Sequence, residues 1–364
     1  MSNMPSNLLF FELVQIAIGK KERFSKQPSK SDWQMLYDIA RKQALIGICF
    51  HGIKRLPQEQ TTNMPLPLKM QWLALTASIQ KRNEIMNRRC FQLQKRLEDV
   101  GYSGCILKGQ GIAAIYTESL SNLRQSGDID IWVKGGLDSI IALAKKLNQR
   151  TILTEQHADL RFFEDAEVEA HFIPTMLKNP LVNKRLQRWI KQQEYAQFAN
   201  HNRDELCVPT LQFNLVYLMI HTYRHIFGEG IGLRQVMDYY MLLCSHSIDE
   251  KLKANTILCL RSFNLHKFAA GLMWVLKEVF QLSNESMLCP PNKKHGQFIL
   301  NEIMIAGNMG HYDKRLIAIQ NASKLKRFCL INIHTFRLLK YYPAETLFAP
   351  IIRMWVWIWR KKQV

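Results

Sequence analysis

The sequence predicts an α+β protein in which a small mixed β-sheet is embedded in a mostly helical chain. Two patterns carry this prediction. Apolar residues recur at helical intervals over much of residues 1–100 and 176–364, and segments between them alternate apolar and polar residues as strands do. With 364 residues and 47% hydrophobic content, the chain can bury one large core or two modest ones. We therefore expect an N-terminal helical region (1–100), a sheet-containing core (101–175) and a C-terminal helical region (176–364).

The strongest helical pattern of the N-terminal region covers residues 67–101, which predict one long helix or two consecutive ones. Its apolar stripe is expected to face the core and to consist of Trp72, Leu73, Leu75, Ile79, Ile85, Met86, Phe91, Leu93 and Leu97. In the C-terminal region, the sequence Cys289-Pro-Pro-Asn292 marks a loop at residues 283–294 between helical segments.

The core begins with a pattern that is typical of anion binding. Residues 105–116 predict a short apolar strand, a turn at Gly109 to Gly111 and the start of a helix. Free N–H groups and the helix dipole make such a turn a site for phosphates. Lys108 adds a mobile cation beside it.

The most informative segment follows, at Gly127-Asp-Ile-Asp130. Isoleucine or valine alternates here with Asp128, Asp130 and Trp132, as in a strand with one apolar face. The two aspartates then lie on the same side, roughly 7 Å apart along the strand. They repel each other, and one tends to stay protonated unless a cation such as Mg²⁺ lies between them. The alternative is an edge strand with a solvated polar face. A phosphate cradle followed by Asp-x-Asp on a strand is, however, the pattern of nucleotidyl transfer.

A third carboxylate can come from residues 167–172, which alternate again. Glu167, Glu169 and His171 share one face of this predicted strand. The alternative is a hairpin arm that turns near residues 164–165 and has a solvated acidic face.

In this order, the motifs resemble those of the uncharacterised bacterial nucleotidyltransferases of the DNA polymerase beta superfamily. The matching motifs are Leu107-Lys-Gly109, Leu123-Arg124 with Gly127-Asp-Ile-Asp130, and Val168-Glu-Ala-His171. Residues 221–225 and 230–238 are similar to the helical motif that follows the catalytic domain in that family.

The resemblance implies a metal-dependent enzyme that transfers a nucleoside monophosphate from an NTP to an acceptor by two-metal phosphoryl transfer. Asp128 and Asp130 would hold Mg²⁺ or Mn²⁺, and Glu169 would be the third carboxylate, near the acceptor. The sequence does not identify the acceptor. Its reacting group is a hydroxyl or a phosphate, and it belongs to a small molecule, a sugar, a protein or RNA. The implied nucleotide-binding residues are Lys108, Gly109, Gln110, Arg124, Ser126 and Gly127. Further contacts in the cleft would come from His171, His221, Arg234 and Asp238.

Several alternatives remain beside these assignments. Glu167 competes with Glu169 for the role of third carboxylate. Arg234 and Asp238 are spaced i, i+4 and could form an ion pair within one helix.

Gln110 stands where the wider superfamily has a phosphate-binding serine. A catalytically lapsed fold that binds nucleotide, a partner or a membrane surface is therefore the second functional hypothesis.

The net charge of +19 lies mainly in the flanks. Residues 1–100 contain 16 Lys and Arg against 8 Asp and Glu, and residues 301–364 contain 11 against 3. These basic flanks predict weak contact with a polyanion or a membrane surface, or else solvated helix faces. At the C-terminal end, Trp355, Trp357 and Trp359 precede Arg360-Lys-Lys362. We expect these tryptophans to pack under the helices rather than to lie on a membrane interface.

The eight cysteines show no paired spacing, which favours reduced, buried thiols. The N-terminal residues lack the basic segment of a signal peptide. The apolar run at residues 354–359 is too short to span a bilayer. These observations predict a cytoplasmic protein without a transmembrane segment.

Overall fold

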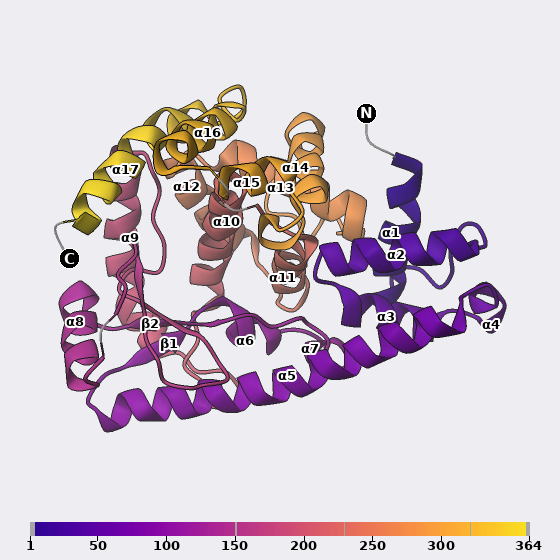
Figure 1. The fold of residues 1–364 in the computed structure, drawn as a ribbon, viewed down its shortest axis with the longest axis horizontal. Helices are drawn as coiled ribbons and strands as arrows, with labels where there is room; N and C mark the ends of the chain where they lie inside the picture. The colour runs from indigo at the N-terminus through magenta and orange to yellow at the C-terminus, as the bar shows by residue number, and fades with distance from the viewer. Residues whose placement is uncertain (1–3, 150, 229, 321, 362–364) are drawn as a thin grey trace.

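The computed structural model describes residues 4–149, 151–228, 230–320 and 322–361. It confirms the α+β prediction, because one small mixed sheet lies among many helices (Figure 1). The N-terminal region contains α1 (Met4–Ala17), α2 (Lys30–Lys42), α3 (Ile46–Arg55), α4 (Gln58–Thr61) and α5 (Leu66–Asp99).

The sheet-containing segment comprises β1 (Gly104–Ile106), α6 (Lys108–Ala113), α7 (Glu118–Ser121), β2 (Ile129–Val133), α8 (Gly136–Lys146), β3 (His157–Asp159) and β4 (Val168–His171). The strand order is β1-β2-β4-β3. The central strands β2 and β4 are parallel, while β1 and β3 pair with them in antiparallel orientation. Strand β2 therefore has a neighbour on each side, which excludes the edge-strand alternative.

The remaining elements are helical: α9 (Pro180–Phe198), α10 (Leu211–Phe227), α11 (Leu233–Cys244), α12 (Glu250–Ser262), α13 (His266–Phe280), α14 (Lys293–Ala306), η1 (Asn308–Gly310), α15 (Lys314–Gln320), α16 (Lys324–Phe336) and α17 (Pro343–Lys361). The predicted loop near the Pro-Pro sequence separates α13 from α14. In Figure 1, α16 and α17 lie on the opposite side of the molecule from α5.

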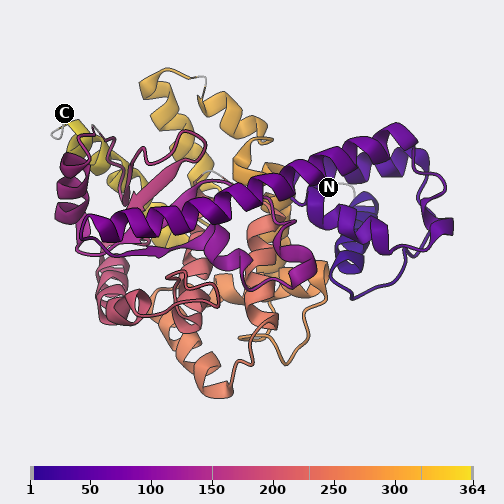
Figure 2. The ribbon, with the colours of Figure 1, turned by 90° about the horizontal axis from the view of Figure 1, so that it is seen from below.

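Helix α5 is continuous over 34 residues and joins the N-terminal helices to the sheet. Figure 2 shows it crossing the molecule from the sheet to α1–α4. Its buried residues are three, four or seven positions apart, which places them on one face: Leu68, Trp72, Thr76, Asn83, Met86, Cys90, Leu93 and Leu97. The predicted stripe was wrong in part, because Leu73, Leu75 and Phe91 fall off this face and are exposed. Asn83 takes an apolar position because its amide donates to the carbonyls of Asn122 (2.7 Å) and Arg124 (2.8 Å).

Strand β2 is covered on both faces. Ile129, Ile131 and Val133 pack in one cluster with α5 and α8. On the other face, Trp132 stacks on Phe213 of α10, with 5.8 Å between the ring centroids. On this second face, Trp132 and the helix that it contacts cover the end of β2 near Val133. The open end of this face is therefore the one that carries Asp128 and Asp130.

The C-terminal tryptophans differ from the prediction. Trp355 and Trp357 are 57% and 56% exposed, because the buried face of α17 is formed by residues such as Ala349 and Val356. The side chains of Trp359, Arg360, Lys361 and Lys362 lie outside the described part of the structure. Among the described residues, no helix combines the length and apolar character needed to cross a membrane.

All eight cysteines are free thiols. Cys49, Cys90, Cys105 and Cys207 are buried as expected, whereas Cys244 and Cys329 are exposed.

We expect Gly47→Ala to destabilise the fold next to the polar end of the sheet. A Cβ at this position in α3 would lie 2.7 Å from the carbonyl oxygen of Leu123, a backbone atom that cannot turn aside. Overpacking costs about 1–3 kcal/mol, which exceeds the helix-propensity gain of about 1 kcal/mol for alanine over glycine. Urea denaturation should show a lower midpoint, whereas Lys54→Ala on the exposed face of α3 should leave it unchanged. A raised midpoint for Gly47→Ala would contradict this packing.

Candidate active site

A cavity of about 500 Å³ lies between the polar end of β2 and β4 and helices α10, α11, α16 and α17. Its volume is in the range of small-molecule sites, about 300–1,000 Å³. The carboxylates of Asp128, Asp130 and Glu169 line it, together with Lys108 and Gly109 from the turn after β1.

Two neighbouring parallel strands bring the three carboxylates together. Asp130 on β2 is directly opposite Glu169 on β4, and Asp128 immediately precedes β2. Each carboxylate offers one oxygen, and these oxygens all lie within 4.8 Å of one another. Several carboxylate oxygens at such separations suit a hard divalent cation. Glu167 is exposed before β4 and belongs to neither group of potential metal ligands found among the described residues.

Asp130 is the most buried of the three, and two cations contact it. Lys108 Nζ and His171 Nε2 lie 2.7 and 2.8 Å from the same oxygen, Oδ1. Burial alone would raise the pKa of Asp130, but Lys108 and His171 outweigh it and hold that pKa below its ordinary value. The negative charge of Asp130, together with burial, raises the pKa of Asp128. The two aspartates therefore have opposite pKa shifts, so Asp128 takes up a proton at a higher pH than Asp130 does.

The turn after β1 brings Lys108 to Asp130. Leu107 donates its backbone N–H to the carbonyl of Asp130 (2.8 Å), and Lys108 and Gly109 both adopt φ values of +39°. Helix α6 begins at Lys108, before the glycines, and is distorted at Gly109. The sequence placed the helix start after the turn, so the observed turn is tighter than predicted.

Glu169 has two histidine neighbours. Its Oε2 lies 3.3 Å from His157 Nδ1 and 3.5 Å from His171 Nε2. Burial and the nearby His171 lower the pKa of His157 to about 3. Burial also opposes the charged form of His171, but hydrogen bonds to Asp130 and Glu169 raise its pKa above the ordinary value. At neutral pH, His157 is therefore neutral, and His171 is the histidine that tends to carry a proton.

His157 also lies at the site, although the sequence did not predict it. The only signal was the short alternation in residues 157–159, which forms edge strand β3 and pairs His157 with His171. His157, Glu169 and His171 make a second group close enough to hold a metal. Imidazole donors suit transition metals, whereas the all-oxygen group suits Mg²⁺ or Mn²⁺.

Arg124 and Asp238 form a buried ion pair. The guanidinium Nε and Nη2 donate to Asp238 at 2.7 and 2.9 Å, and the Tyr116 hydroxyl donates to the same carboxylate at 2.7 Å. Arg234 instead donates to the carbonyl of Gln125 (2.6 Å). The alternative ion pair between Arg234 and Asp238 within α11 was therefore wrong, because the loop before β2 supplies the partner. All three charged side chains still line the cavity.

The other predicted residues divide into two groups. Gly127 and His221 line the cavity, and burial lowers the pKa of His221, which leaves it neutral. Gln110 and Ser126 are not among the described residues that line it. The Gln110 amide donates to Asn87 on α5, away from the carboxylates.

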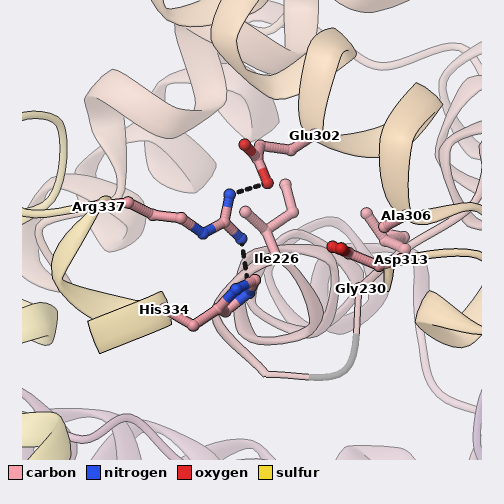
Figure 3. A pocket seen from close by; sticks show the side chains of 8 residues that line it. Ile226, Gly230, Glu302, Ala306, Asp313, His334 and Arg337 are labelled. Carbon is pink, nitrogen blue, oxygen red and sulfur yellow. Dashed lines mark hydrogen bonds and ion pairs between the residues drawn. The ribbon is translucent and has the colours of Figure 1, made fainter. Parts of the chain in front are cut away.

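A second, much smaller cavity of about 10 Å³ holds at most about one water. Figure 3 shows Glu302 facing Arg337 and Arg337 facing His334. Arg315 bridges Glu302 (3.2 Å) and Asp313 (2.7 Å). These charges pair with one another, so the cluster fastens α14, α15 and α16 together.

We expect Asp238→Asn to be strongly destabilising, because it leaves the buried Arg124 charge uncompensated. Removing one partner of a buried pair costs about 3–5 kcal/mol. Asp165→Asn provides a matched control, since Asp165 receives two guanidinium bonds from Arg89 at 2.9 Å but is 41% exposed. Its loss should have a far smaller effect. Chemical denaturation measures both variants, and equal losses would contradict the buried pair.

No curated protein and no solved structure matches the chain. A family model described as "Uncharacterised nucleotidyltransferase" matches residues 29–281. This match includes the whole sheet, the three carboxylates and helices α10 and α11. The resemblance found in the sequence is thereby confirmed, and the chain belongs to this family of nucleotidyltransferases.

Proposed function

We propose that this protein is a metal-dependent nucleotidyltransferase that transfers a nucleoside monophosphate from an NTP to a hydroxyl or phosphate of an acceptor. The observation that carries the proposal is the convergence of Asp128, Asp130 and Glu169 from parallel strands, with one oxygen of each within 4.8 Å of the others. Family membership makes a nucleotide the expected substrate.

The oxygen donors fit Mg²⁺ or Mn²⁺, and Asp128, Asp130 and Glu169 would hold the ions. Bound divalent ions would neutralise the phosphate charge and favour ionisation of the acceptor. The acceptor oxygen then forms a bond to the α-phosphorus, the bond from that phosphorus to the α–β bridging oxygen breaks, and pyrophosphate leaves. Glu169, oriented by His157 and His171, would accept the proton of an acceptor hydroxyl.

The triphosphate would bind at the β1–β2 side of the cavity. Lys108, Gly109 and Arg234 line the cavity there, and the charge of Arg234 acts on Asp128. Burial, followed by the charge of Arg124, lowers the pKa of Arg234 to about 10, so it remains a cation at neutral pH. Because Asn87 holds the amide of Gln110, we assign the role of the superfamily serine to Lys108 and to backbone N–H groups of the turn.

We expect the thermal midpoint to rise more with NTP and Mg²⁺ together than with either alone, because linked ligands stabilise the native state by mass action. Asp130→Asn should abolish this synergy, since it removes a charge that the metal requires. Differential scanning fluorimetry measures the shifts. Equal synergy in wild type and Asp130→Asn would place metal binding elsewhere.

Glu169→Gln should retain nucleotide binding but lose transfer. General-base assistance contributes about 10²–10⁴-fold to the rate, and a weaker catalytic metal site would add to the loss. Labelled NTPs, Mn²⁺ or Mg²⁺ and cell extract, followed by mass spectrometry of the products, measure the transfer.

The control is Glu167→Gln, an exposed residue two positions earlier, which should leave transfer unchanged. If this control lost activity instead, Glu167 would be the third carboxylate. If wild type bound NTP but modified no acceptor, the lapsed fold would be the better description.

A further inference from the structure

The cavity continues beyond Glu169 into a second group of basic residues. Lys178 comes from the loop before α9, Arg224 from α10 and Arg353 from α17, and all three line the cavity. None of them belongs to the residues assigned above to the metals or to the triphosphate. We refer to Lys178, Arg224 and Arg353 as the distal basic group.

The distal basic group lies on the β3–β4 side of the carboxylates. Arg224 donates to the side chain of Gln156 (2.6 Å), and the carbonyl of Gln156 accepts the backbone N–H of Phe172 (3.0 Å), just after β4. Lys108 and Gly109 instead follow β1, at the other end of the strand order β1-β2-β4-β3. Glu169 thus lies between the proposed triphosphate side and the distal basic group, where the acceptor must approach.

Hydrogen bonds hold the backbone of Lys178 in place, while its side-chain ammonium group can still bind a ligand. Its N–H and that of Asn179 donate to the carboxylate of Glu345 on α17, at 2.6 and 3.3 Å. In the described part of the chain, Lys178 Nζ forms no hydrogen bond or ion pair. A half-buried ammonium group without a direct partner favours an anionic ligand.

Arg353 is also held in place before any ligand binds. Its Nη1 donates to Asn332 (2.5 Å) and its Nη2 to Thr335 (2.6 Å), both on α16. Helix α16 is in turn fastened to α14 by the Glu302, Arg337 and His334 cluster of Figure 3. A guanidinium fixed in this way loses little conformational entropy when it binds an anion.

We propose that the acceptor is a small molecule that carries a phosphate or carboxylate group, which Lys178 and Arg353 bind while the acceptor's reactive oxygen lies at Glu169. This inference rests on the proposed function and adds the substrate class. A cavity of about 500 Å³ suits a nucleotide and a small partner better than a folded protein or RNA.

The charges around Lys178 make its anion affinity depend on pH. Burial, together with the positive charges of Arg353 and Arg224, lowers the pKa of Lys178 to about 8. The negative charges of Glu345 and Glu155 oppose this shift. Anion binding requires the protonated amine, so the affinity should be full below this pKa and should fall as the pH rises through it.

Sulfate is a suitable probe because its charge does not change over this range. We would titrate it into protein saturated with Mg²⁺ and a non-hydrolysable NTP analogue, which occupies the triphosphate side. Lys178→Met should bind sulfate at least about tenfold more weakly, because one of its cations is lost. Lys178→Arg should restore binding and remove the pH dependence near 8. The matched control Lys184→Met, on the exposed face of α9, should bind like wild type.

The outcomes separate this inference from the proposed function. If the analogue and Mg²⁺ fail to bind wild type, the proposed function is wrong. If they bind, but sulfate affinity is the same in all variants and shows no fall near pH 8, this inference alone is overturned. In the transfer assay, label on a small molecule whose acceptor part carries its own phosphate or carboxylate group supports it, whereas label found only on RNA, protein, lipid or a small acceptor without such a group would overturn it.

Discussion

The burial of the Asp130 carboxylate is the constraint on which the site depends. Asp130 lies on the central strand and is 4% exposed, and an isolated charge in that position would be very costly. Lys108 and His171 compensate it from two sides. To reach Asp130, Lys108 adopts a positive φ that non-glycine residues rarely take. His171 requires the parallel register of β2 and β4, which also places Glu169 opposite Asp130. The compensation of one charge therefore fixes both the turn after β1 and the third carboxylate.

The helical segments complete the site through buried polar contacts. Asn83 of α5 holds the carbonyl of Arg124, and the Arg124 side chain reaches Asp238 of α11. A chain of contacts thus runs from α5, through the loop before β2, to the helix that carries Arg234. Buried ion pairs give little net stability compared with apolar packing. Buried ion pairs do require a strict geometry, however. Here that geometry fixes the position of the Arg234 guanidinium relative to Asp128.

The sequence was informative where a pattern is local. Alternation placed Asp128 and Asp130 on one side of a strand and Glu169 on another, and the structure brings their oxygens together. Partners from distant segments could not be predicted. The spacing of Arg234 and Asp238 suggested a helical pair, but Arg124, 114 residues away in sequence, forms the bond. His157 lies on a strand of three residues, and an alternation this short is too weak a signal to predict a strand. Exposure on long helices was also hard to predict, as Leu73 and Trp355 show, because hydrophobicity alone does not tell which face meets a neighbour.

The family match ends at residue 281, yet α16 and α17 contribute Arg327, Glu345 and Arg353 to the cavity. Residues within the match supply the carboxylates and the turn after β1, to which we assign the metals and the triphosphate in the proposed reaction. Glu345 connects the two parts, since its carboxylate holds the backbone of Lys178. Burial raises the pKa of Glu345, while the N–H of Lys178, the charge of its ammonium and the N–H of Asn179 oppose the rise; the direct hydrogen bonds come from the backbone and not from Nζ. The ammonium of Lys178 is thereby left for a ligand. Under the proposed function, a change in α17 would therefore alter which acceptor binds without disturbing the residues that we assign to the nucleotide.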